Sequence, residues 1–322
     1  MKRKLTINFG KLFGILLYVL AVHQRRLVIR NLRFCYPEWH DDQIKKLARR
    51  VFKNFGITFI EVCQSAFISW DELSSRYRVI GEDILINALK ANKGILIITA
   101  HMGNWEVAQH YMHNFEKPFS VVATKMKQAW ANRLLDHLRS RFGNTVIDKK
   151  GGLPNIMQAL RRGETVALLI DQSRRKQGIE VTFFGHEATA TPAAALLAMR
   201  CKSEATATPA AALLAMRCKS TVLPMFCVRD PDGQLTIHVK PPLETIRTGD
   251  LRSDLQTNTQ IMMNAVEEMI REYPDQWFWT LKPWKVAYPH LYREWEERRR
   301  KRKTRKKRRV VSQKPSSAVT PR

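Results

Sequence analysis

Cysteine pairs, glycine-rich loops and acidic residues are all scarce in this chain of 322 residues. None of its five cysteines has a C-x-x-C spacing, and Cys201 and Cys218 are the same residue of a stretch that occurs twice. This usage is typical of a reducing compartment and predicts no structural metal site. The chain also lacks the motifs G-x-S-x-G, H-E-x-x-H, G-x-x-x-x-G-K-[ST] and G-x-G-x-x-G. The usual hydrolase, P-loop and dinucleotide-binding signatures are therefore absent.

A hydrophobic run long enough to cross a bilayer is missing as well. The apolar segment at 12–22 has about half of the roughly 20 residues that a spanning helix needs. No small-residue cleavage site follows it, as a signal peptide would require. Basic residues lie on both sides of the segment: Lys2, Arg3, Lys4 and Lys11 precede it, and HQRRLVIRNLR follows it. We expect residues 1–40 to form a membrane-contacting segment with amphipathic helices, while a buried core helix and the remnant of a longer span remain alternatives.

The charge balance is strongly basic, with 29 acidic residues against 55 lysines and arginines and a net charge of +26. Eleven of the twelve residues from Arg298 to Arg309 are basic, so residues 296–322 are expected to form a disordered basic tail. The rest of the chain is basic too, which favours an anionic partner such as a phospholipid surface or an acidic carrier protein. No helix-turn-helix or aromatic-basic strand motif occurs, so nucleic acid is not expected.

Short apolar runs alternate with helical patterns through the middle of the chain. The runs predict strands at 94–100, 119–124, 164–170, 220–228 and 234–240. Amphipathic spacing predicts one or two helices at 41–67 and further helices at 131–143, 153–163 and from 256 to Pro274. This alternation predicts an α/β fold with its functional groups beyond the carboxyl ends of the strands.

The stretch ILIITAHMGNWEVAQ contains the sharpest candidate site. His101 directly follows a predicted buried strand, and Glu106 lies five residues further on. Five residues on one regular helix place two side chains about 140° apart, so the pair converges only if His101 lies in the turn and Glu106 in the first helical turn. That arrangement suits a general base whose imidazole is oriented by a carboxylate. The alternative is a structural histidine beside a solvent-facing glutamate.

The same stretch resembles a known family. TAHMGNWEVA (99–108) is similar to the His-x4-Asp/Glu motif of the lipid A biosynthesis lauroyl and myristoyl acyltransferases, within the wider lysophospholipid acyltransferase group. Further blocks follow in the family's order: RRLVIRNLRFCYPE (25–38), HLRSRFG (137–143), LLIDQSRRKQGIEVTFFGHEATATP (168–192), TVLPMF (221–226) and YPDQWFWTLKPWK (273–285). The resemblance implies a glycerolipid-acyltransferase-like domain at 41–295, with a mixed central sheet flanked by helices.

This resemblance implies transfer of a fatty acyl chain from acyl carrier protein, or from a CoA thioester, to a hydroxyl of a phosphorylated lipid A precursor. His101 would deprotonate the hydroxyl and Glu106 would orient the imidazole, with no covalent acyl-enzyme, metal or cofactor. The expected location is the cytoplasmic face of the inner membrane, at an anionic lipid surface. The alternatives are an acyltransferase for another lysophospholipid or glycolipid, and a non-catalytic basic membrane-binding protein.

Six further residues are candidates for substrate binding: Asn104, Lys125, Arg139, Arg141, Asp171 and Gln172. Among these, Arg139 and Arg141 with Lys125 are candidates for phosphate contacts. Asp171 and Gln172 come at a strand end, where acceptor binding and loop bracing are both open. Two roles are open for the aromatic residues. Phe183 and Phe184 either line an acyl channel or pack in the core. The tryptophans lie either at a membrane interface or in the core, namely Trp277, Trp279 and Trp284.

Residues 187–203 and 204–220 are the same seventeen letters in tandem. Two identical copies are unlike the several imperfect copies of a repeat protein, and one copy suffices for the family's passage into the next strand. Each copy offers a short helix that starts at Thr-Pro. We expect one copy to occupy the fold and the other to form a surplus helical hairpin or loop at the surface, whose exposed Ala/Leu face would reduce stability or increase aggregation.

Overall fold

The computed structural model describes most of the chain, namely residues 2–115, 117–124, 128–172, 178–200, 220–294 and 297. Three features named above lie outside this part: Lys125, residues 201–219 of the doubled stretch, and the basic tail from 298 onward. The α-helices are α1 (Lys2–Leu20), α2 (Val22–Cys35), α3 (Asp41–Gln64), α4 (Trp70–Ser74), α5 (Glu82–Lys90), α6 (Trp105–Ala108), α7 (Ala129–Ser140), α8 (Leu153–Arg161), α9 (Ala193–Arg200) and α11 (Leu251–Glu272). Short 3₁₀ helices are η1 (Gln109–Asn114), η2 (Pro283–Lys285) and η3 (Pro289–Tyr292).

A seven-stranded sheet forms the centre, in the order β1-β9-β8-β2-β5-β3-β4. Its strands are β1 (Tyr77–Ile80), β2 (Ile95–Thr99), β3 (Phe119–Ala123), β4 (Thr145–Asp148), β5 (Thr165–Leu169), β8 (Thr221–Arg229) and β9 (Leu235–Val239). Neighbouring strands pair in parallel except β8 and β9, which form an antiparallel hairpin. A separate hairpin contains β6 (Ile179–Phe183) and β7 (His186–Ala190). The predicted α/β fold with a mixed, helix-flanked sheet is confirmed.

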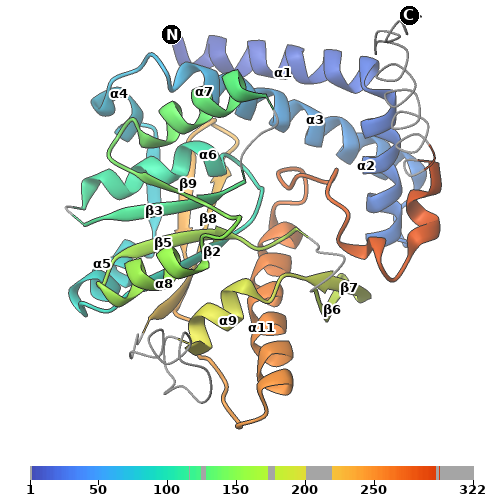
Figure 1. Cartoon of the computed structure of the whole chain (residues 1–322). Coiled ribbons are helices and arrows are strands. Elements are labelled where there is room, and N and C mark those ends of the chain that lie inside the picture. Colours follow the sequence, from blue (N-terminus) through green and yellow to red (C-terminus); the bar gives the residue numbers. More distant parts are fainter. Residues whose placement is uncertain are drawn as a thin grey trace, which may run out of the picture.

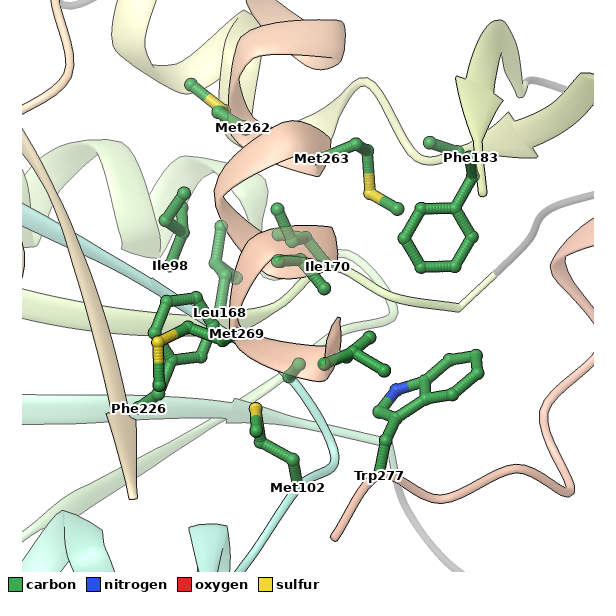
Figure 2. Packing of buried hydrophobic residues seen from close by; sticks show 14 of the residues in the cluster. Ile98, Met102, Leu168, Ile170, Phe183, Phe226, Met262, Met263, Met269 and Trp277 are labelled. Atoms are coloured by element: carbon green, nitrogen blue, oxygen red, sulfur yellow. The ribbon is translucent and has the colours of Figure 1, made fainter. Parts of the chain in front are cut away.

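The side chains of the central strands alternate between two apolar layers. On β2, Leu96 and Ile98 face the larger cluster, which contains residues of α8, α9 and α11. Ile95 and Ile97 face the smaller cluster, formed with α5, α6 and η1. Figure 2 shows the larger cluster, where methionines of α11 gather with side chains of the sheet and with the ring of Trp277. Both faces of β2 are therefore buried, as its unbroken apolar run predicts.

The two N-terminal helices lie against α3, which is a single helix (Figure 1). Three glycines allow this close approach: a Cβ on Gly56 would lie 2.3 Å from the carbonyl oxygen of Gly10 and 2.5 Å from the nitrogen of Gly14. Real side-chain carbons do not approach backbone atoms so closely, so the contact requires glycine on both helices. α1 is thereby attached to the body of the protein along one face.

The first copy of the doubled stretch is part of the fold. Its residues 187–190 lie in β7, and residues 193–200 form α9. Ala194, Ala195 and Leu197 of α9 are buried in the larger apolar cluster. After α9 the chain returns to the sheet at Thr221, which pairs with Ile95 at the amino end of β2. The predicted slot is thus filled by the first copy, and the predicted surplus element falls outside the described residues.

The doubling offers a matched pair of substitutions, Leu197→Ala and Leu214→Ala, at equivalent positions in identical sequence. Leu197 is 1% exposed, so its truncation is expected to destabilise the protein by about 2–5 kcal/mol. Because the described core contains the first copy, truncation of Leu214 should change the free energy of unfolding by less than about 1 kcal/mol. Urea unfolding of both variants measures the difference. Equal losses, or a larger loss for Leu214→Ala, would contradict the assignment of the slot to the first copy.

Candidate active site

The carboxyl ends of two neighbouring parallel strands bring His101 and Asp171 together. Thr99 of β2 pairs with Leu169 of β5, and the two candidate residues lie two positions beyond these partners. The Nδ1 atom of His101 lies 2.7 Å from Oδ1 of Asp171, and the backbone nitrogen of His101 donates to Oδ2 at 2.8 Å. The register of the two strands therefore produces a histidine–carboxylate pair from residues 70 positions apart.

Asp171 is 1% exposed and is held by a third donor, Nε1 of Trp277, at 2.9 Å from Oδ2. Burial raises the pKa of the Asp171 carboxyl. The adjacent His101 and the hydrogen bonds lower the pKa by more than burial raises it, so the net pKa lies below its ordinary value. The carboxyl group is thus an ionised acceptor. It serves as a brace for the turn after β2, which was one of the two roles left open for this residue.

The imidazole of His101 is arranged as a base. Burial lowers its pKa, but the charge of Asp171 and the hydrogen bond to it raise the pKa more, to a net value above 6.5. With Nδ1 donating to the carboxylate, the neutral ring has its lone pair on Nε2. The side-chain nitrogen of Gln172 lies 3.2 Å from that atom. A hydroxyl in the adjoining cavity could lose its proton to Nε2.

Glu106 was expected to orient the imidazole, and the described structure corrects this expectation, because Asp171 occupies that position. Glu106 instead forms a two-pronged ion pair with Arg139 of α7, with Nε of the arginine 2.9 Å from Oε2 and Nη2 bonded to Oε1. Both side chains line the same cavity as His101. The motif therefore brings its histidine and glutamate to one site, but with different partners.

Asn104 was expected to bind substrate, and this expectation is wrong for the described structure. Its side chain is 0% exposed and does not line the cavity. The Oδ1 atom accepts from the backbone nitrogen of Val107 at 3.1 Å and so caps α6, while Nδ2 donates to Oε2 of Glu61 at 2.7 Å. Gly103 before it has φ = +54°, and a Cβ there would lie 1.8 Å from the carbonyl oxygen of Cys227.

The remaining candidates lie in different places. Gln172 lines the cavity. Arg141 does not, and its guanidinium bonds the carbonyl oxygen of Ser65 and lies over the ring of Phe142. The aromatic residues form core: the five side chains are all at most 3% exposed and contact one another, namely Phe183, Phe184, Trp277, Trp279 and Trp284.

A cavity of about 570 Å³ adjoins the histidine, and most of its wall is apolar. Aliphatic side chains of β2, β3 and β5 line it, and so do Pro192, Leu196 and Leu197 of the first copy. The polar side chains of the lining include His101, Gln172 and Lys149. Such a cavity suits a long apolar group whose reactive end meets the imidazole.

Sequence reasoning missed several polar residues around the turn. Lys149 follows β4, which had not been predicted, and Glu61 and Arg229 form a buried ion pair behind Asn104. A signal existed for Glu61, which is a charge on the otherwise apolar face of α3. Among the residues that the structure describes, no group of three His, Cys, Asp or Glu side chains could hold a metal ion.

The sequence pattern of the bacterial lipid A biosynthesis acyltransferases matches residues 1–206 and 202–286, two segments that meet within the doubled stretch. A lipid A biosynthesis acyltransferase of Haemophilus influenzae is 25% identical over 279 residues, covering 85% of this chain and 79% of the relative. The lipid A biosynthesis myristoyltransferase of Escherichia coli is 21% identical, covering 84% and 78%. A phosphatidylinositol mannoside acyltransferase of Mycolicibacterium smegmatis is 26% identical, covering 66% and 64%.

The effect of Asp171 on the base can be measured directly. In Asp171→Asn, the pKa of His101 is expected to fall, because burial still disfavours the imidazolium while the carboxylate that offsets burial is gone. NMR titration of protein with ¹⁵N-labelled histidine measures this change. His110 is an internal control, because burial lowers its pKa to about 4. A His101 pKa that does not change would contradict the role of Asp171.

Proposed function

The chain belongs to the bacterial lipid A biosynthesis acyltransferase family and is an acyltransferase, and we propose that it transfers a fatty acyl chain from a thioester to a hydroxyl of a phosphorylated lipid A precursor. The observation that carries the proposal is the His101–Asp171 pair beside a largely apolar cavity of about 570 Å³. An imidazole with its lone pair on Nε2 supplies the base, and the cavity supplies a place for the acyl chain.

In the proposed reaction, Nε2 of His101 takes the proton of the acceptor hydroxyl as its oxygen attacks the thioester carbonyl carbon. The resulting tetrahedral intermediate collapses when the carbon–sulfur bond breaks. The proton on the imidazolium passes to the departing thiolate, so the histidine returns to its neutral form. Asp171 stabilises the imidazolium in between and keeps Nδ1 as the protonated nitrogen. This route requires no covalent acyl-enzyme.

Arg139 is the proposed phosphate contact at the cavity. Its pair with Glu106 uses the Nε and Nη2 atoms, and a guanidinium has five N–H donors, so further donors are available for a phosphate oxygen. Lys125, just beyond β3, is proposed to share this role. Arg141 is not proposed as a phosphate contact, because its side chain does not line the cavity.

The proposed donor is acyl carrier protein, with CoA as the alternative thioester carrier. An acidic carrier fits a chain whose net charge is +26. The acceptor has a specific alternative as well, because one relative is named a phosphatidylinositol mannoside acyltransferase. A different phosphorylated glycolipid would fit the same base and cavity.

A membrane surface is the proposed location, at the cytoplasmic face of the inner membrane, with α1 as the contact. Opposite its glycine face, α1 exposes an apolar stripe in which each side chain is at least 50% exposed: Leu5, Phe9, Leu12, Leu16, Val19 and Leu20. Lysines such as Lys11 lie on the same helix. Within the described residues no single helix is long and apolar enough to cross a bilayer, and α1 with α2, bent by 93°, meets that criterion only as a pair. An interfacial helix fits this pattern.

Substitution of the base tests the reaction. His101→Ala is expected to lower the rate of acyl transfer by about 10²–10⁴-fold, because a general base contributes about that much. The assay follows transfer from acyl-acyl carrier protein to a lipid A precursor by thin-layer chromatography. The melting temperature, measured by circular dichroism, shows whether the variant folds. A folded variant whose rate stays within threefold of wild type would rule out the mechanism.

The membrane contact is tested separately with the double variant Leu12→Glu/Leu16→Glu. Two carboxylates in the apolar stripe are expected to weaken binding to vesicles of phosphatidylethanolamine and phosphatidylglycerol by more than about tenfold, because the lost burial costs about 1.5–3 kcal/mol for each leucine. Cosedimentation with the vesicles measures the binding. The matched control is Ile246→Glu/Leu251→Glu, at exposed apolar positions that are not part of α1. Equal binding by the α1 variant and this control would contradict the proposal.

A further inference from the structure

A buried ion pair lies behind the turn that contains His101. Glu61 of α3 and Arg229 at the end of β8 are each 6% exposed, and they contact through both oxygens of the carboxylate. Taking two charges out of water is costly, and such a pair is weak evidence for stability alone. The position of this pair, directly under the turn, indicates a role in placing the site.

Two residues of the turn after His101, Gly103 and Asn104, are attached to this region. Thr58, one helical turn before Glu61 on α3, donates to the carbonyl oxygen of Gly103 at 2.7 Å. Glu61 accepts from Nδ2 of Asn104 at 2.7 Å. The backbone nitrogen of Gly103 donates to the carbonyl oxygen of Gln276 at 2.9 Å, and the side chain of Gln276 bonds both backbone groups of Arg229 at 2.7 Å.

These bonds set where α6 begins. Asn104 is the N-cap of α6, so its Oδ1 must point at the backbone nitrogen of Val107. The bond from Nδ2 to Glu61 fixes the amide in that orientation, because the two ends of the group then have different partners. Glu106 is the second residue of the helix that starts here. Its carboxylate holds Arg139 at the cavity wall.

We propose that Glu61, acting through Asn104, is a positioning residue that fixes Glu106 and Arg139 relative to His101. Arg229 keeps the carboxylate of Glu61 in place, and neither residue touches the cavity. The proposal rests on the proposed acyl transfer for its kinetic readout. A displacement of about 1 Å at a reacting centre can cost about 100-fold in rate, so loss of this bond should lower kcat without a matching loss of stability.

Asn104→Ser separates the two bonds of the side chain. The serine hydroxyl can still accept from the nitrogen of Val107 and cap the helix, but it is too short to donate to Glu61. The expected result is a kcat lowered by about 10–100-fold, with KM for the donor within threefold of wild type. The matched control is Asn258→Ser, which removes buried and partly buried hydrogen bonds to residues 246 and 254, none of which lines the cavity. It should lower the melting temperature at least as much and leave kcat unchanged.

A double-variant cycle tests whether Glu61 acts through Asn104. If it does, Glu61→Gln in the Asn104→Ser background will cost no further kcat, although Glu61→Gln alone lowers it. If the double variant loses kcat by the product of the two single losses, the proposal is overturned. A folded Asn104→Ser that keeps kcat within threefold of wild type would overturn it as well. Should Asn104→Ser fail to fold, Thr58→Val decides, because it removes the hydroxyl that donates to Gly103 and accepts from Arg229, and it changes no charge. A normal kcat in Thr58→Val would then overturn the proposal.

One readout does not depend on the reaction. The Nε–H of Arg139 is bonded to Glu106, so its NMR signal should be protected from exchange with water in wild type and in Asn258→Ser. In Asn104→Ser the protection should be lost. If wild type transfers no acyl chain yet shows this pattern, the proposed function fails while the positioning role stands. Undiminished protection in Asn104→Ser would overturn the positioning role itself.

Discussion

The carboxylate of Asp171 is the buried charge on which the rest of the site depends. It accepts from the ring and the backbone of His101 and from the indole of Trp277. A buried carboxylate without donors is costly, so the turn after β2 and the segment after α11 must both lie where their N–H groups reach it. The bonds that orient the base are therefore the bonds that join three parts of the fold. The same hydrogen bonds to Asp171 thus hold the backbone in place and orient the catalytic imidazole.

The central strands could be predicted because parallel strands buried on both faces leave unbroken apolar runs. β1 and β4 left no such run, because they are the two edges of the sheet and part of each strand is exposed. The hairpin of β6 and β7 was missed since it lies outside the main sheet and follows no long apolar segment. Local patterns thus predicted the middle of the fold better than its borders.

The partners within the site could not be predicted in the same way. His101 was identified from its place after a strand and from the motif around it, but its carboxylate partner lies 70 positions away. The meeting with Asp171 depends on β5 lying beside β2 and on the register of that pair, neither of which a local pattern contains. Glu106 is nearer in sequence, yet α6 aims it at Arg139. Asn104 has a polar side chain of the kind that binds substrates, but it is fully buried and caps α6.

The connection from α9 to β8 has a consequence for the history of the chain. It rejoins the sheet at Thr221, beside the amino end of β2, whereas His101 lies beyond the carboxyl end of that strand. A five-residue strand is about 16 Å long, so the point where this connection rejoins the sheet is separated from the reacting groups by the length of β2. Natural selection for catalysis therefore places little restraint on length there. An extra copy of a core segment can persist at such a position and drift, as spare material from which a new surface could evolve.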